Sequence, residues 1–371
     1  MLPRDLNKPA SMLNDAGGSS PWLYRGRVPS LDGLRAISIL FVLGFHGLAW
    51  PVGHLGVRIF FVISGFLITV LLLREERASG GISLKNFYMR RVLRILPAYV
   101  AFLLAVFVMT RSGIEVLRPV DWMGVLTYTA NLITGKPGVI AHLWSLSLEE
   151  QFYLLWPPVL VFSGVRRARW FLLAYLVVAP FLRAACRFFL PDERALAYTG
   201  VFAMTPIILG CLLAIAAFDE RLRPRLEIRK QSVTWFLFGC IGIVMASLWA
   251  EDVPGYGILL DDLVSGSAIA GIIWVMALHP VNALGWILNT GPMVLLGTVS
   301  YGLYIWQQPF LIGSLASVGR PWDLLLPFVC CAISYLAIER PFLSLKDRRF
   351  GATKELVDRA PAASLAAEQS A

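Results

Sequence analysis

The sequence predicts an all-α protein, a polytopic membrane helical bundle of about ten transmembrane helices. Of its 371 residues, 57% are hydrophobic and only 15% are charged. The mean hydropathy of +0.67 is too high for a soluble domain. Several apolar runs approach the roughly 20 residues that a helix needs to cross a bilayer, and the strand alternation of a membrane barrel is absent from the sequence.

The apolar runs define ten expected spans in chain order. They cover residues 33–50, 56–73, 92–110, 143–162, 168–190, 199–218, 233–250, 262–280, 292–315 and 322–340. A shorter run at 123–134 is expected to be re-entrant or interfacial. The division that follows is a flexible cytosolic segment (1–29), a membrane-embedded domain (30–342) and a cytosolic tail (343–371).

Charged residues alternate between the two sides of these spans. With the N-terminus in the cytosol, the cytosolic connections carry the arginine clusters, and the opposite side carries Asp192, Glu193, Glu251, Asp252, Asp261 and Asp262. That is the positive-inside pattern, so the net charge of +9 indicates no nucleic-acid partner. The intramembrane cations Arg58 and Arg183 are interpreted as snorkelling residues. The five cysteines lie in spans without ligand spacing, which indicates neither a metal site nor a disulfide framework.

The first span, LDGLRAISILFVLGFHGLAW at 31–50, carries three polar residues that lipid disfavours. Arg35 and His46 are eleven positions apart, which is about three helical turns and roughly 16 Å on one helix face. Asp32 lies three residues before Arg35 and can pair with it. For His46, a simple hydrogen bond between helices is the structural alternative to a catalytic role.

The fourth span begins HLWSLSLEEQFYLLWP at 142–157. His142, Ser145, Glu149 and Tyr153 recur at helical spacing and share one face, whereas Glu150 is expected to point elsewhere. Glu149 and His46 can reach a similar depth on different helices. We expect them to form a general-base pair in which the carboxylate orients the imidazole.

The third span begins with an arginine cluster, in KNFYMRRVLRILPAY at 85–99. Arg90, Arg91 and Arg94 lie on the expected cytosolic face, and forked guanidinium groups suit phosphate recognition. Positive-inside anchoring is the alternative explanation.

These segments together resemble the acyltransferase-3 family of bacterial membrane O-acyltransferases. The resemblance rests on LDGLRAISILFVLGFH, GVRIFFVISGFLI, FYMRRVLRILP and HLWSLSLEEQFYLLWP, with weaker similarity in SYGLYIWQQPF and YLAIERPF. It covers essentially all of residues 30–342. One departure is Gln307, where family members often have His, since Gln does not carry a proton near neutral pH.

The resemblance implies transfer of an acyl group, usually acetyl, from cytosolic acyl-CoA to a hydroxyl of a glycan such as exopolysaccharide, O-antigen or lipo-oligosaccharide. Some family members modify macrolides instead. Acetyl-CoA is then a co-substrate, no cofactor is bound permanently, and the protein lies in the bacterial inner membrane with both termini cytosolic. Longer members carry an extracytoplasmic hydrolase-like domain, which we expect to be on a separate protein here.

A mechanism follows for these positions. The arginines Arg35, Arg90, Arg91 and Arg94 hold the coenzyme phosphates, and His46, set by Glu149, deprotonates the acceptor hydroxyl. Direct transfer and a covalent acyl-His intermediate both remain open. Candidate oxyanion or orienting groups are Ser145, Tyr153, Ser64, Asp32 and His142.

Two other classes of protein are compatible with a polar membrane bundle. A proton-coupled secondary transporter would also use intramembrane His and Glu, but the two related halves typical of transporters are not found in the sequence. A non-catalytic scaffold would leave those residues without a purpose. Binding of acetyl-CoA discriminates the enzyme from both, and the oligomeric state is left open.

Overall fold

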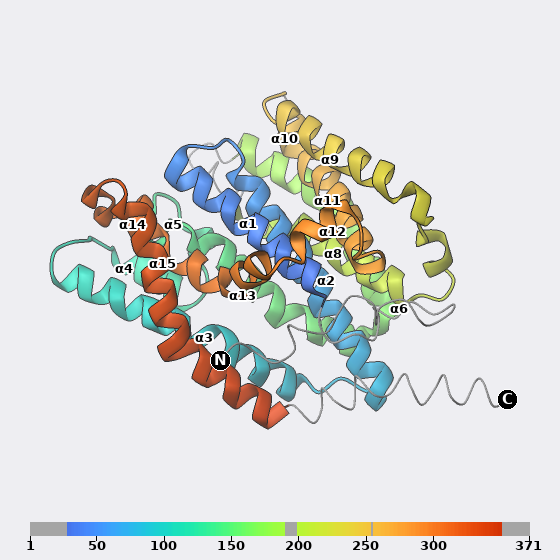
Figure 1. Ribbon diagram of the computed structural model, residues 1–371, viewed down its shortest axis with the longest axis horizontal. Helices are drawn as coiled ribbons and strands as arrows, with labels where there is room; N and C mark the ends of the chain where they lie inside the picture. The colour runs from blue at the N-terminus through green and yellow to red at the C-terminus, as the bar shows by residue number, and fades with distance from the viewer. Residues whose placement is uncertain (1–27, 190–198, 254, 351–371) are drawn as a thin grey trace.

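The computed structural model describes residues 28–189, 199–253 and 255–350. Within these ranges every regular element is a helix, and Figure 1 shows the helices gathered into one bundle. This confirms the predicted all-α membrane bundle. The longer helices are α1 (Pro29–Leu48), α2 (Gly53–Ser79), α3 (Leu84–Arg111), α6 (Leu143–Phe189), α8 (Thr205–Phe218), α9 (Val233–Ala250), α11 (Asp261–Leu278), α13 (Gly291–Trp306) and α15 (Trp322–Ser334).

Shorter helical elements connect or extend the long ones. They are α4 (Pro119–Leu126), η4 (Ala130–Leu132), α5 (Gly138–Ala141), η6 (Val201–Met204), η7 (Arg223–Leu226), η8 (Lys230–Ser232), α10 (Tyr256–Leu259), α12 (Ala283–Leu288), α14 (Gln308–Leu311), η9 (Ser314–Val318) and the π-helical η10 (Tyr335–Glu339). Proline at the first or second position begins α1, α4, α8 and α13, where its missing N–H costs no helical hydrogen bond.

Eight helices in the described part of the chain are long and apolar enough to cross a membrane. Two features explain why this number is smaller than the ten spans predicted from the sequence. The predicted spans 143–162 and 168–190 both lie in α6, and the predicted span 292–315 is divided among α13, α14 and η9. α13 has 16 residues, which is short for a complete crossing.

Gly164 divides α6 into two halves. Its φ of 71° and ψ of 160° are non-helical and suit a residue without a Cβ. The first half begins beside Tyr304 near the end of α13, to which Ser145 is hydrogen-bonded, whereas Arg169, just after the turn, lies 3.5 Å from Asp219 at the end of α8. Arg183 then lies 2.5 Å from Asp262 at the start of α11. The two halves therefore run in opposite directions between two ends of the bundle.

We call these the basic end and the acidic end. The basic end is where α2 and α8 finish and α3 begins. The acidic end is where α1 finishes and α2 and α11 begin. Helix contacts fix the directions, because Gly297 of α13 lies against Asp32 of α1, and Gly47 of α1 lies against Leu311 beyond α13. α1 and α13 are therefore parallel, as the alternation of the predicted spans requires.

Glycines allow α2 and α8 to pack closely at the centre of the bundle (Figure 1). A Cβ on Gly65 would lie 1.9 Å from the carbonyl oxygen of Ile207, and one on Gly210 would lie 2.2 Å from that of Val62. Small residues at such contacts bring two backbones together, which is the main source of helix association in lipid.

A buried ion cluster joins α2, α6 and α11 at the acidic end. Arg58 forms an ion pair with Asp261 and lies 2.9 Å from Asp262, which also accepts from Arg183. The Asp261 side chain is 1% exposed and Arg183 is 5% exposed. The interpretation of Arg58 and Arg183 as snorkelling residues is therefore wrong, because both are neutralised by aspartates inside the bundle.

The segment between α3 and α6 forms only short helices, in agreement with the prediction that it does not cross the membrane. The predicted 123–134 run forms the end of α4 and η4. Tyr99 of α3 donates a hydrogen bond to the Val125 carbonyl at 2.6 Å and stacks on Tyr128. At the start of α4, the Arg118 guanidinium holds the pKa of Asp121 below its usual range. The segment is thus fixed against the bundle.

The described helices begin at the predicted N-terminal limit of the membrane domain and extend past its predicted C-terminal limit. α1 begins at Pro29, and the helix that starts at Trp322 continues through η10 to Phe350, past the predicted limit at residue 342. The remainder of the predicted terminal segments, residues 1–27 and 351–371, lies outside the described residues.

The α2–α8 contact generates a stability prediction. Gly65→Ala should lower the free energy of unfolding by about 1–3 kcal/mol, because the added methyl group meets backbone that has to move. Gly242→Ala on α9 is the matched control, since a Cβ there meets nothing within 4 Å. Thermal unfolding of both variants in detergent checks this, and an equal melting temperature for the two would contradict the close packing.

Candidate functional site

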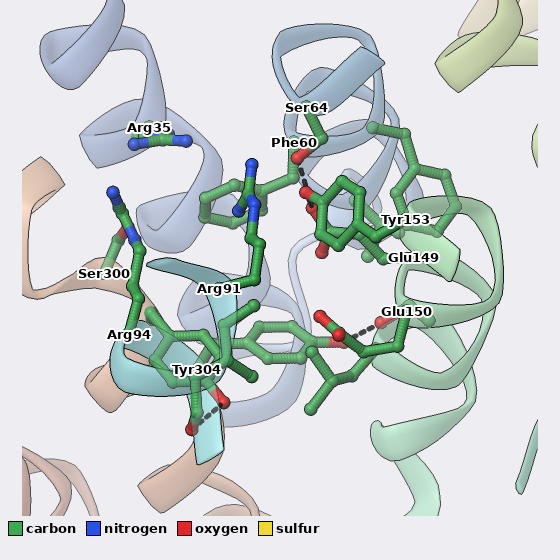
Figure 2. Close-up of a pocket in the computed structure, with 16 residues that line it drawn as sticks. Arg35, Phe60, Ser64, Arg91, Arg94, Glu149, Glu150, Tyr153, Ser300 and Tyr304 are labelled. Carbon is green, nitrogen blue, oxygen red and sulfur yellow. Dashed lines mark hydrogen bonds between the residues drawn. The ribbon is translucent and has the colours of Figure 1, made fainter. Parts of the chain in front are cut away.

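A pocket lies between α1, α2, α3, α6 and α13 on the basic side of the bundle (Figure 2). It encloses about 80 Å³, well below the roughly 300 Å³ or more of pockets that surround a drug-sized ligand. A narrow group fits such a space, and a large one does not. Its lining residues are Arg35, Val57, Phe60, Phe61, Ser64, Arg91, Arg94, Ile95, Ser145, Leu146, Glu149, Glu150, Tyr153, Ser300, Tyr301 and Tyr304.

Three of the predicted arginines form a positive rim on this pocket. Figure 2 shows Arg35 from α1 facing Arg91 and Arg94 from α3. Arg35 lies 3.9 Å from Asp32, a long ion pair one helical turn away. Among the described residues, neither Arg91 nor Arg94 has a carboxylate within ion-pair distance. The rim therefore presents guanidinium groups that can bind an anion.

Arg90 is separated from this rim. It forms an ion pair of 2.7 Å with Glu75 of α2 and does not line the pocket. Glu75 also accepts a hydrogen bond from the backbone N–H of Ser83, so this pair closes the connection between α2 and α3. Arg90 and Arg91 are adjacent in sequence, and their side chains leave α3 in different directions. The sequence prediction grouped them, but the structure places only Arg91 in the pocket.

Glu149 lies in the pocket with two hydroxyl donors. Its Oε1 accepts hydrogen bonds from Ser64 of α2 and from Tyr153, one turn further along α6 (Figure 2). The Arg91 guanidinium lies 4.3 Å over the Tyr153 ring. Arg91, Tyr153 and Glu149 therefore form a continuous polar contact from the rim to the pocket interior.

Glu150 also lines the pocket, so the prediction that it points elsewhere is wrong. Its Oε1 is buried and has no hydrogen-bond partner among the described residues. The adjacent carboxylates Glu149 and Glu150 therefore both line the pocket. The pocket is thus more polar than the sequence indicated.

Tyr304 and Ser145 close the pocket toward the acidic end. Their hydroxyls lie within hydrogen-bond distance of each other, and both lie near the His142 carbonyl oxygen, Tyr304 at 3.0 Å and Ser145 at 3.1 Å. Because each hydroxyl carries one proton, two of these three contacts are hydrogen bonds at any one time. The His142 ring packs edge-on against Tyr304, with ring centroids 5.4 Å apart. His142 is 3% exposed, and neither ring nitrogen has a hydrogen-bond partner among the described residues. Its side chain is beyond the pocket rather than in it.

His46 lies further toward the acidic end, and Gln307 is its partner. The distance between Nδ1 of His46 and Oε1 of Gln307 is 2.9 Å. Gln307 uses its amide N–H to donate to Gln308 at 2.7 Å, so its oxygen faces the imidazole. An amide oxygen only accepts, so Nδ1 of His46 carries the proton. The other ring nitrogen, Nε2, then keeps its lone pair.

The predicted pairing of His46 with Glu149 is not formed in the structure. His46 is bonded to Gln307, the residue that follows α13, and Glu149 is bonded to Ser64 and Tyr153. The sequence prediction placed the two side chains at a similar depth on different helices, but Tyr304 and Ser145 close the pocket on the side of His46. Depth along a helix gives no information on which neighbour a side chain meets.

α13 and Gln307, which follows it, connect the two regions. Ser300 and Tyr304 were not among the predicted site residues, and Gln307 was noted only as a departure from the family. Ser300, Tyr304 and Gln307 recur at spacings of four and three, so they share one helix face. Ser300 and Tyr304 line the pocket, and Gln307 holds His46. The block SYGLYIWQQPF carried this periodicity, which is the signal that could have identified Tyr304.

Comparison with known proteins identifies the family to which this architecture belongs. Residues 28–338 match the acyltransferase-3 family model, described as an acyltransferase domain. The chain belongs to this family. It is 31% identical to the peptidoglycan O-acetyltransferase OatA of Listeria monocytogenes over 348 residues, which are 85% of this chain and 56% of that protein.

Two further relatives give the same result. The putative peptidoglycan O-acetyltransferase YrhL of Bacillus subtilis is 30% identical over 359 residues, covering 87% of this chain and 56% of that protein. The O-acetyltransferase OatA of Staphylococcus aureus is 27% identical over 85% of this chain and 57% of that protein. The chain thus spans little more than half the length of these relatives. No solved structure matches it.

The His46–Gln307 bond generates a spectroscopic prediction. Nitrogen NMR of protein labelled at its four histidines should show one neutral ring protonated at Nδ1, and this signal should disappear in Gln307→Leu. His279 is the internal control, because its Nε2 lies 2.9 Å from the Ile228 carbonyl and must donate. A His46 ring protonated at Nε2 in the wild-type protein would refute the assignment.

Proposed function

We propose that this chain transfers an acyl group, specifically acetyl, from acetyl-CoA at the basic end to a hydroxyl of a glycan at the acidic end. Family membership supports an acyltransferase, and the names of three relatives support acetyl as the group transferred. Two of these names specify peptidoglycan, which supports a glycan acceptor.

The observation that carries the proposal is the placement of a cationic pocket and a basic imidazole along the same pair of helices. α1 carries Arg35 at the rim and His46 eleven residues further on, about 16 Å along the helix. α13 runs parallel and contributes Tyr304 between them. A donor with an anionic body and a thin reactive arm fits this arrangement.

The donor is acetyl-CoA in this account. Its phosphates bind Arg35, Arg91 and Arg94, where charge-assisted forked hydrogen bonds are strongest. Its narrow arm enters the small pocket, and the thioester reaches the wall formed by Tyr304 and Ser145. Tyr153, held between Arg91 and Glu149, fixes the rim arginine in place.

The chemical step uses the lone pair on Nε2 of His46. The acceptor oxygen attacks the thioester carbonyl carbon while Nε2 takes the hydroxyl proton. The tetrahedral intermediate then collapses, the C–S bond breaks, and the imidazolium returns the proton to the departing thiolate. The Tyr304 and Ser145 hydroxyls are the donors placed to stabilise the oxyanion once the arm separates them. The imidazole of His46 is oriented by the neutral amide of Gln307 and not, as the sequence predicted, by the carboxylate of Glu149.

This scheme sets the orientation in the membrane. The basic end faces the cytosol, where acyl-CoA is made, as the positive-inside pattern requires. His46 then lies near the outer surface, within reach of an exported glycan. The bilayer is the inner membrane of a bacterial cell, and both termini are cytosolic.

His46→Ala should lower the rate of acetyl transfer at least about a hundredfold, because a positioned general base contributes that much. The assay measures radiolabelled acetyl moved from acetyl-CoA to N-acetylglucosamine oligomers by the full chain in proteoliposomes. His54→Ala is the matched control, since His54 is an exposed imidazole near the start of α2. Near-normal transfer by His46→Ala would refute the role of His46. Absence of both acetyl-CoA binding and transfer in the wild type would favour a transporter.

Arg91→Ala should raise the KM for acetyl-CoA about tenfold with a smaller effect on kcat, because one charge-assisted contact to the donor is lost. Lys85→Ala removes a charge from the same end of α3 at an exposed position outside the pocket and should leave KM unchanged. Steady-state kinetics of both variants tests this. An equal rise in both would show that general surface charge, not the rim, binds the donor.

A further inference from the structure

A second, larger cavity lies at the basic end between the ends of α2 and α8 and the turn in α6. It encloses about 560 Å³. It shares no lining residue with the pocket between α1 and α13. We call it the α2–α6–α8 pocket. Its lining residues are Leu73, Glu76, Arg77, Val165, Arg166, Arg169, Ile215, Phe218, Asp219 and Arg221.

The Gly164 turn creates this pocket. Because Gly164 reverses the direction of α6, the arginines that follow it point back toward α8 instead of continuing along a straight helix. Arg166 and Arg169 therefore meet Asp219 and Arg221, which follow α8, across a hollow floored by Phe218 and Leu73. The cations belong to three separate segments, and only the fold brings them together.

The charges in the pocket do not balance. Four arginines oppose two carboxylates, Glu76 and Asp219, which leaves two positive charges. Asp219 is already engaged by Arg169 at 3.5 Å and by the Arg221 backbone N–H at 2.9 Å. Within the described chain, Arg166 and the Arg221 guanidinium have no carboxylate at ion-pair distance. The unmatched charge comes from these two side chains.

Two of the cations are held in fixed positions by other contacts. Arg77 donates to the Phe218 carbonyl oxygen at 2.5 Å and lies 4.6 Å over the Phe218 ring. Arg169 is paired with Asp219. These contacts order one wall of the pocket before a ligand binds. Arg166 and Arg221, which supply the unmatched charge, are exposed.

The pocket opens where the protein surface changes from apolar to basic. Trp170, four residues after Arg166 on the same helix face, is 60% exposed, and Phe162, before the turn, is 81% exposed. Large exposed aromatic side chains on a spanning helix face lipid, and Trp is typical of the headgroup level. The lining side chains Val165, Ile215 and Leu73 are apolar, so the pocket presents both charged groups and apolar surface to one ligand.

We propose that the α2–α6–α8 pocket binds the phosphate of an anionic phospholipid headgroup. Guanidinium groups match phosphate in charge and geometry, and basic pockets between transmembrane helices at the cytoplasmic side suit anionic headgroups. General anchoring by the positive-inside pattern needs only exposed cations and no cavity. This inference does not depend on the proposed acyltransferase chemistry, because it uses none of its residues.

The test is retention of lipid by the purified full chain, measured by native mass spectrometry in detergent. Wild-type protein should retain phosphatidylglycerol in preference to phosphatidylcholine. Arg166→Ala with Arg221→Ala should weaken phosphatidylglycerol retention about tenfold or more, because two cations near the headgroup are lost. Arg225→Ala with Arg229→Ala is the matched control, removing the same charge from exposed positions outside the pocket, and should retain the lipid as the wild type does.

Two results would overturn the proposal. An equal loss in the control variant would show that overall charge, not the pocket, holds the lipid. Binding of glycerol 3-phosphate as tight as that of phosphatidylglycerol would show a site for a soluble phosphate instead of a lipid. Arg166→Lys with Arg221→Lys separates binding from folding, since it keeps both charges and should retain lipid at an intermediate level.

Discussion

Polar side chains inside a membrane bundle must find their partners within the protein, and this constraint organises the whole molecule. Arg58 and Arg183 are neutralised by Asp261 and Asp262, and Glu149 is bonded to two hydroxyls. These contacts hold helices at fixed depths, because each broken contact would leave a charge in hydrocarbon. The polar groups left without a partner are then the ones available for a ligand.

The same constraint explains why His46 is suited to proton transfer. Gln307 satisfies one ring nitrogen, and the geometry of the Gln307–Gln308 pair determines that this nitrogen is the donor. The unsatisfied nitrogen is a base in a region close to the acidic end. At the other end of α1, Arg35 joins a cationic rim in which Arg91 and Arg94 have no carboxylate at ion-pair distance among the described residues. One helix thus links a site for an anion and a site for a proton.

The sequence predicted the elements that depend on composition and periodicity, and it failed where the answer depends on which helices are neighbours. Hydropathy identified the membrane bundle, and the Arg35, Arg91 and Arg94 positions lie together as their spacing and shared side indicated. The pairing of His46 with Glu149 was wrong because equal depth does not specify rotation. Arg90 and Arg91 are adjacent in sequence, and only the fold shows that Arg90 forms an ion pair with Glu75. The break between the predicted spans 143–162 and 168–190 agrees with the non-helical Gly164 that divides α6.

The central claim is that donor and acceptor reach the reaction from opposite ends of the bundle. Proteoliposomes that contain the full chain in one orientation, with radiolabelled acetyl-CoA supplied only at the basic end and glycan trapped at the acidic end, test it directly. The account predicts labelled glycan in the acidic-end compartment, dependent on His46. Labelled glycan formed only when acceptor and donor share one compartment would contradict it.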